Sequence, residues 1–111
     1  VAAICQQLRT GIPDFRAEVR QVFAQPPSDV SVDAPISIAL CSAMSAEGLP
    51  VGVEGVSAWT DAALINGAGI PAICFGPGDM GLAHADEEWV SLSEIEQATR
   101  VLTRLVQDWC G

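Results

Sequence analysis

Three segments of the chain carry apolar residues at the three- and four-residue intervals that mark one face of a helix. They lie in residues 1–8, 36–43 and 95–109. In the second segment the predicted buried stripe is Ile36, Ala39, Leu40 and Ala43, and in the third it is Ile95, Ala98, Leu102, Leu105, Val106 and Trp109. The spacing predicts three helices, each with one apolar face turned toward a core.

Residues that start and stop helices border the second and third segments. Asp33 can cap the second helix, and Pro35 suits its first turn because the missing N–H is not needed there. Gly48 is a typical residue just beyond a helix end. Ser91 and Glu94 fit the S-x-x-E capping box. These signals predict helices that begin near residues 34 and 92.

The intervening segments have strand-like patterns. Apolar and mostly charged residues alternate over 15–23, residues 51–58 form a short glycine-containing run, and residues 70–75 are almost continuously apolar. Between the last two, Thr60 or Asp61 can cap a brief helix that ends near residue 66. Because candidate strands alternate with amphipathic helices, we expect an α/β fold.

The charge balance excludes several classes of function. The chain carries 14 acidic residues and five arginines, for a formal net charge of −9, and it contains no lysine. Such a field repels nucleic acid and anionic membrane surfaces, so neither is expected as a partner. Without lysine, the chain cannot form a Walker-type phosphate loop, a Schiff base or a pyridoxal site.

Cysteine spacing and hydropathy suggest a cytoplasmic protein. The four cysteines are Cys5, Cys41, Cys74 and Cys110, and they are too far apart in sequence for a C-x-x-C metal motif. Free thiols of this kind are typical of a reducing compartment. No apolar run approaches the roughly 20 residues that span a bilayer, and no signal-like segment is present.

Candidate chemistry is concentrated in a polar loop after residues 70–75. This loop contains the only histidine, His84, with acidic residues at 86–88. A solvated surface histidine and a metal ligand oriented by a nearby carboxylate are both compatible with these local features. The preceding turn, residues 76–78, reads Gly-Pro-Gly and offers free backbone amides to an anionic ligand. Asp61 is a third candidate, although helix caps are common.

Several short motifs give these residues a family context. The chain reads W-T-D-A-A over 59–63, A-G-I-P over 68–71, F-G-P-G over 75–78, A-H at 83–84 and E-W-V over 88–90. In order and spacing these motifs resemble the closing section of the M20 peptidase and aminoacylase superfamily. They are similar to its acetylornithine deacetylase and succinyl-diaminopimelate desuccinylase branch.

The resemblance implies a domain organisation. Residues 1–25 would be the tail of the lid, or dimerisation, domain, and residues 26–111 the C-terminal part of the catalytic domain, a mixed sheet flanked by helices. Because the other half of that domain is not in this chain, we expect a homo-oligomer such as a dimer, in which sheet edges and helix faces meant for intrachain partners are covered.

The resemblance also implies site roles. His84 would bind one of two zinc ions, for which cobalt can substitute. The substrate-binding residues would be Thr60, Asp61, Gly76 and Gly78. The family usually has H-x-x-D-E or H-x-x-N-E, whereas this chain has Glu87 before Glu88. These two glutamates are the candidate partners of the ligand histidine.

The family's other zinc ligands, its bridging aspartate and its general-base glutamate precede the segment that this chain resembles. We therefore expect a fragment of a di-zinc hydrolase, a metallopeptidase-type amidase that cleaves N-acyl amide or peptide-like bonds of small amino-acid substrates. One imidazole cannot hold a catalytic zinc, so this chain alone should have no catalytic residues and no activity. The alternative is a non-catalytic truncated module that folds by self-association. A serine hydrolase is disfavoured, because Gly55-Val56-Ser57-Ala58-Trp59 breaks the G-x-S-x-G motif.

Overall fold

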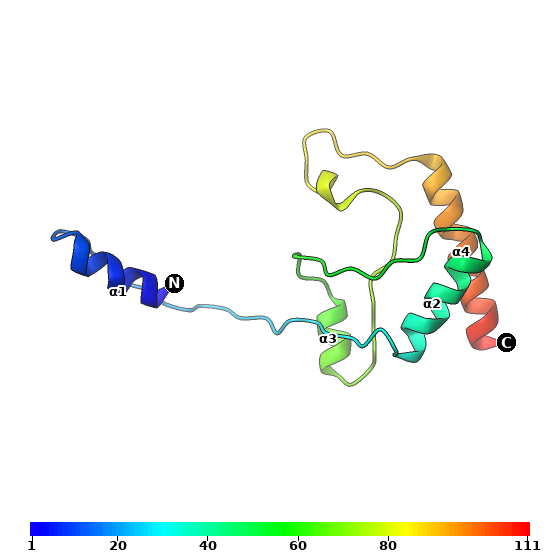
Figure 1. Cartoon of the computed structure of the whole chain (residues 1–111), viewed down its shortest axis with the longest axis horizontal. Helices are drawn as coiled ribbons and strands as arrows, with labels where there is room; N and C mark the ends of the chain where they lie inside the picture. Colours follow the sequence, from blue (N-terminus) through cyan, green and yellow to red (C-terminus); the bar gives the residue numbers. More distant parts are fainter.

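The chain forms four α-helices and one short 3-10 helix, joined by extended segments (Figure 1). The computed structural model describes all 111 residues. The helices are α1 (Ala2–Gly11), α2 (Pro35–Ala46), α3 (Ala62–Gly67), η1 (Met80–Leu82) and α4 (Leu92–Cys110). All the predicted helices are present, and the boundaries lie within a few residues of those expected.

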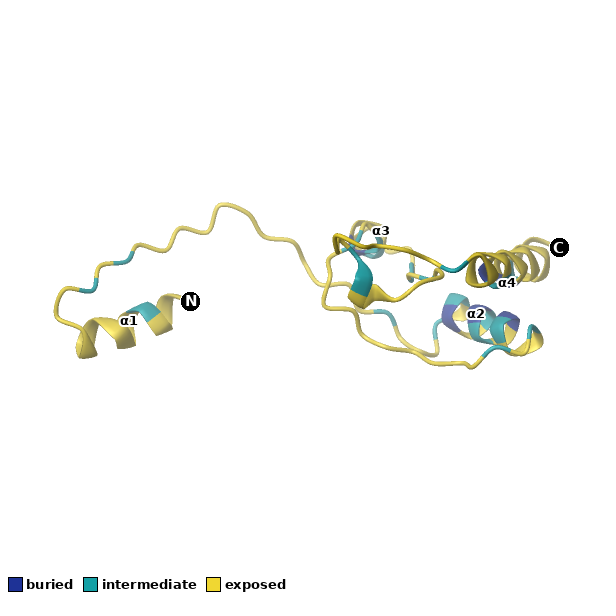
Figure 2. Ribbon diagram, turned by 90° about the horizontal axis from the view of Figure 1, so that it is seen from above, coloured by how far each residue is buried: buried dark blue, intermediate teal, exposed yellow.

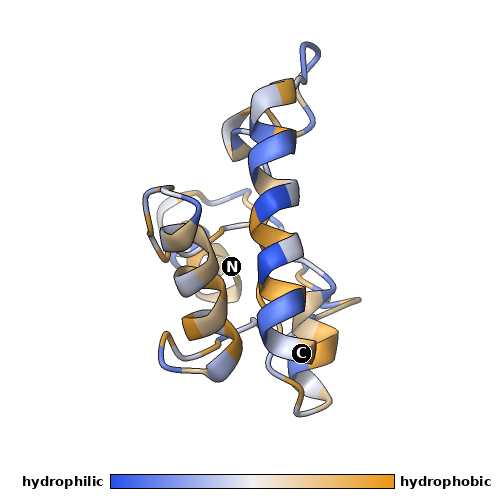
Figure 3. Ribbon diagram, turned by 90° about the vertical axis from the view of Figure 1, so that its right-hand side faces the viewer, coloured by the Kyte–Doolittle hydropathy of each residue, from blue (hydrophilic) through white to orange (hydrophobic).

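The core lies between α2 and α4. Leu40 and Ala43 of α2 pack with Val101 of α4, which is 0% exposed. The partly buried side chains around this cluster are Met44, Leu49, Ile73, Phe75 and Leu105. Figure 2 shows the buried residues on the facing sides of the two helices, and Figure 3 shows the mainly apolar α2 beside the more hydrophilic α4.

Local interactions define both ends of α2. Pro35 occupies the first turn, and the Ser37 hydroxyl donates a hydrogen bond to the Ser31 carbonyl at 3.0 Å. At the other end Gly48 has φ 72°, and the N–H of Leu49 bonds to the Met44 carbonyl at 3.0 Å. This is the Schellman arrangement, in which a left-handed glycine reverses the chain and places the next apolar residue against the helix.

An ion pair joins the end of α2 to α4. The Glu47 carboxylate lies 2.8 Å from the Arg104 Nε and 3.5 Å from the Arg100 Nε. Because both guanidinium groups are substantially exposed, this contact adds little to the free energy of unfolding.

The α4 stripe predicted from the sequence is only partly correct. Ala98 is buried and Leu105 half-buried as expected, but Val101 rather than Leu102 lies in the core. The residues Ile95, Leu102, Val106 and Trp109 are exposed. The reason is that α2 covers only a narrow strip of α4, and periodicity alone does not locate that strip.

The predicted α/β fold, with its mixed sheet flanked by helices, is wrong, because the structure contains no β-strand. Segments 15–23, 51–58 and 70–75 are extended, but no backbone ladder joins them. Alternation of apolar and polar residues gives an extended chain one apolar and one polar face. It does not provide a second strand with which the backbone can pair. A strand is stable only when it pairs with such a neighbour.

Residues 70–75 are held by side chains in place of a sheet. The Asn66 amide donates to the Ala72 carbonyl at 2.9 Å, and its oxygen accepts from the Ala72 N–H at 2.7 Å. The same amide nitrogen donates to the Ser28 hydroxyl. Further along, Ile73 and Phe75 pack against the helix pair. In this run, Ile73 and Phe75 are therefore partly buried by the helices, whereas Ile70 and Cys74 are exposed.

The first part of the chain lies apart from the helix pair. Helix α1 contains no buried residue, and an extended stretch leads from it to α2 (Figure 1). As a result the radius of gyration is 20.2 Å, whereas a compact chain of this length has about 13 Å. No helix combines the length and the apolar character needed to cross a bilayer.

Replacing Val101 with alanine should lower the free energy of unfolding by about 2 kcal/mol, because two methyl groups leave a fully enclosed position. The matched control is Leu102→Ala, next to it on the same helix and 44% exposed, which should cost less than about 0.5 kcal/mol. Urea titration followed by circular dichroism measures both. An equal loss of unfolding free energy in the two variants would refute the placement of Val101 on the buried face of α4.

Replacing Asn66 with alanine should cost about 1–3 kcal/mol, since both backbone groups of Ala72 lose their partner. Asn66→Asp should cost less, because one oxygen can still accept from the Ala72 N–H. Gln21→Ala, an exposed residue, is the control. If Asn66→Ala and Gln21→Ala unfold at the same urea concentration, the side-chain bridge does not support residues 70–75.

Candidate functional site

The loop between Phe75 and α4 carries His84. The histidine is exposed and lies two residues after the end of η1. It has φ 64°, and it is the only residue other than glycine with a positive φ. Its backbone N–H donates to the Glu88 carboxylate at 3.2 Å. A left-handed conformation is uncommon for a residue with a β-carbon, so the surrounding contacts impose a sharp turn at this position.

Glu88 acts on His84 through the backbone. The hydrogen bond joins its carboxylate to the main-chain nitrogen and leaves the imidazole free. Glu87, the residue at which the chain departs from the family pattern, is exposed and makes no hydrogen bond. The structure thus separates the two glutamates, since only Glu88 contacts the histidine.

The Gly76-Pro77-Gly78 turn lies at the start of this loop. Gly78 has φ 95°, and a β-carbon there would lie 3.4 Å from a Val90 methyl group. Its N–H donates to the Glu94 carboxylate of α4 at 3.1 Å. The amide of Gly78 is therefore not free for an anionic ligand in this conformation, in contrast to the sequence expectation.

Thr60 and Asp61 have different surroundings. Thr60 is half-buried, and its hydroxyl accepts a hydrogen bond from the Cys74 thiol at 3.3 Å. Asp61 precedes α3 as its cap residue, but its side chain makes no capping bond and is exposed. The Asp61 carboxylate is thus not used by the helix.

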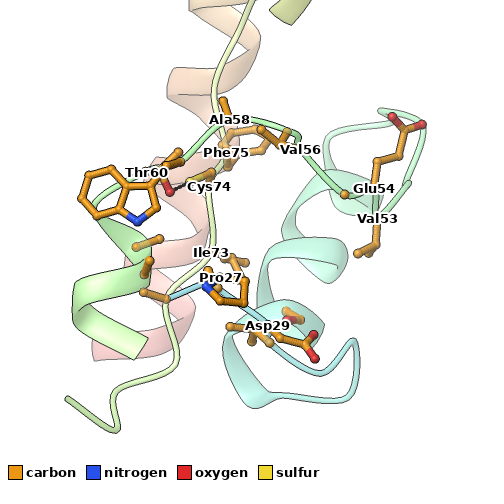
Figure 4. Close-up of a pocket in the computed structure, with 18 of the residues that line it drawn as sticks. Pro27, Asp29, Val53, Glu54, Val56, Ala58, Thr60, Ile73, Cys74 and Phe75 are labelled. Carbon is orange, nitrogen blue, oxygen red and sulfur yellow. Dashed lines mark hydrogen bonds between the residues drawn. The ribbon is translucent and has the colours of Figure 1, made fainter. Parts of the chain in front are cut away.

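A cavity of about 740 Å³ lies beside Thr60 (Figure 4). Its walls come from segments 25–30, 52–60 and 72–75, from one face of α2 and from the start of α3. Figure 4 shows Thr60 and Cys74 side by side on one wall. Gly76, Gly78 and His84 do not line this cavity. The fold therefore does not bring all the predicted site residues to one pocket.

Two residues that position the site were not recognised from the sequence. Glu94 was interpreted as part of a capping box, yet Ser91 makes no side-chain cap bond and the Glu94 carboxylate holds Gly78. Asn66 was interpreted only as the end of a helix, yet it fixes the segment that leads to Cys74. No local signal identifies either role, because each bond joins residues in different elements.

The metal-binding side chains of the chain are dispersed. No three of its histidine, cysteine, aspartate and glutamate residues form a group that could hold a metal ion. A catalytic zinc takes about three protein ligands and a water molecule. The residues present do not fit a complete zinc site, and His84 can supply only one ligand.

Comparison with known proteins places these features in a family. The profile described as "Peptidase family M20/M25/M40" matches residues 4–108. An acetylornithine deacetylase from Myxococcus xanthus is 32% identical over 108 residues, which cover 97% of this chain and 27% of that protein. An N-acetyl-L-citrulline deacetylase from Xanthomonas campestris is 34% identical over 58 residues, 52% of this chain and 16% of that protein.

A third relative is the N-formyl-4-amino-5-aminomethyl-2-methylpyrimidine deformylase of Bacillus subtilis, 35% identical over 52 residues, or 47% of this chain and 12% of that protein. No solved structure matches the chain. The chain spans about a quarter, or less, of the length of these relatives. Because the family profile covers nearly all of its residues, the chain belongs to peptidase family M20/M25/M40.

Proposed function

We propose that this chain is part of a di-zinc amidohydrolase that cleaves an N-acyl amide or peptide-like bond in a small amino-acid substrate. Family membership supports a hydrolase, and the relatives named above are two deacetylases and a deformylase. In this proposal the remaining catalytic machinery lies outside the 111 residues, and the chain alone is not catalytic.

The observation that carries the proposal is the setting of His84. It is the only histidine, its imidazole is exposed, and its backbone is held in a left-handed turn by Glu88. A fixed backbone with an unengaged side chain is suited to a metal ligand, because the backbone is already ordered and only side-chain rotamers are fixed on binding. We assign His84 as one ligand of one zinc ion.

The other residues of the chain serve the substrate in this proposal. Zinc supplies Lewis acidity to such a site when bound. Thr60, at the cavity wall, and Asp61, with a free carboxylate, are assigned to substrate binding. Gly76 and Gly78, in the turn that precedes His84, are assigned to substrate binding as well. Glu88 orients the histidine through its backbone, and Glu87 adds negative charge beside it.

The separate position of α1 supports a division of the chain between two domains. Residues 1–25 would belong to the lid or dimerisation domain, and residues 26–111 to the catalytic domain. Helix α1 has no buried side chain, and the extended stretch after it has few contacts. A helix with an apolar stripe and no partner is expected where a further part of the protein packs on it.

Exposed apolar side chains favour self-association of this chain. On α4 they include Leu102, Val106 and Trp109, and on α1 they include Ile4 and Leu8. Apolar surface of this extent is commonly covered by a second molecule. This arrangement also serves the alternative function, a non-catalytic module that folds by association.

Replacing His84 with alanine should abolish metal-dependent activity in a chimaera. In this chimaera the chain takes the place of the matching 27% of the Myxococcus xanthus acetylornithine deacetylase. Activity should fall by more than about 100-fold, because loss of a ligand exceeds the roughly 10- to 100-fold effect of removing a partner of a ligand. Deacetylation rate and bound zinc are measured together.

The control is Met80→Ala, an exposed side chain of the same loop, which should leave rate and zinc content unchanged. Circular dichroism of each variant verifies the fold. Full activity and zinc content in the His84→Ala chimaera would exclude the histidine as a ligand. Turnover by the 111-residue chain alone would contradict the proposal that the remaining catalytic residues lie outside it.

Sedimentation equilibrium should give a mass well above the 11.6 kDa of one chain. Substituting Val106 and Trp109 together with aspartate should shift the chain toward the monomer, because charge opposes burial of this surface. Substituting Asp108 with asparagine on the same turn is the control. A monomer with unchanged helix content for the original chain would contradict the proposed association.

A further inference from the structure

The contact between Glu94 and Gly78 joins two elements that are 16 residues apart in sequence. Glu94 lies in the first turn of α4, and the buried residues Ala98 and Val101 follow on the same helix. The glutamate backbone is therefore anchored by the best-packed part of the molecule. Its carboxylate reaches from this anchor to the amide of the Gly-Pro-Gly turn.

We propose that Glu94 is a positioning residue, which holds the Gly76-Pro77-Gly78 turn and thereby the loop that presents His84. The role rests on the proposed function, since His84 is the ligand in that proposal. Glu94 itself need not touch substrate or metal.

The turn has little freedom once this bond is made. Gly78 is in a left-handed conformation that favours glycine, and Pro77 has a fixed φ. Phe75, just before the turn, packs on the core. The turn is thus held from the core at its start and from α4 at its end. A hydrogen bond to an ionised carboxylate is stronger than one between neutral groups.

Restraint continues from Gly78 to His84. The Asp79 carboxylate accepts from the Gly81 N–H at 2.7 Å and caps η1. At the far end Glu88 accepts from the His84 N–H. Three carboxylates therefore hold this loop, and Glu94 is the one that connects it to the core helices.

The test must distinguish positioning from a second effect of the same contact, competition with an anionic ligand. The carboxylate lies where an anionic substrate group would meet the Gly78 amide, so Glu94 could act as a competitor that keeps such a group out. The two roles predict opposite effects when Glu94 is removed. Loss of a positioning residue lowers kcat, whereas loss of a competitor lowers KM.

The first measurement uses the 111-residue chain and does not depend on activity. In Glu94→Ala the amide proton of Gly78 should shift upfield in ¹H–¹⁵N spectra, and the resonances of residues 79–84 should broaden or move, while that of Val101 stays in place. Glu94→Gln should shift less, because the side-chain carbonyl can still accept. Glu96→Ala removes the same charge from the same helix and should change none of these resonances.

The second measurement uses the chimaera with the Myxococcus xanthus relative. Glu94→Ala should lower kcat by about 100-fold, as expected for displacement of a site group by about 1 Å, with little change in KM. The Glu94→Gln chimaera should retain most of the parent kcat, and the Glu96→Ala chimaera should have the same kcat as the parent.

The outcomes separate this inference from the proposed function. An active chimaera that requires His84 but tolerates Glu94→Ala overturns the positioning role alone. A lower KM in Glu94→Ala also overturns it, in favour of competition. A chimaera that remains active with His84→Ala overturns the proposed function. Unchanged Gly78 and His84 resonances in Glu94→Ala refute the inference whatever the chimaera does.

Discussion

The packing of α2 against α4 is the contact on which the rest of the structure depends. Leu40, Ala43 and Val101 form its centre. No other two helices of the chain pack against each other. Burial of apolar surface is the main favourable term in folding, so a chain with so few buried side chains relies on this one interface. Ile73 and Phe75 attach the segment before the candidate site to the same interface.

The helix pair positions the candidate site. Phe75 leads directly into the Gly-Pro-Gly turn, and Glu94 of α4 holds the Gly78 amide on the other side. Both contacts originate in the core, although the loop itself is exposed. The exposed loop that carries His84 is thus connected at both ends to the helix pair, which suits a site built on rigid elements.

Part of the strong negative charge has a local structural use. Asp79, Glu88 and Glu94 each accept a backbone N–H within or next to the loop of His84. These amides would otherwise rely on water. The carboxylates therefore order the backbone around the one histidine.

The sequence by itself determined the features that depend on neighbouring residues. Pro35 and Gly48 mark the two ends of α2 because each acts on the backbone within one turn. The order of short motifs around His84 indicated the family that the comparisons established. Tertiary structure alone decided whether residues 70–75 pair with a strand or pack on helices, whether Val101 or Leu102 enters the core, and whether Glu94 bonds Ser91 or Gly78. Each of these choices depends on a partner distant in sequence, and local periodicity and capping patterns carry no information about which distant residue comes close.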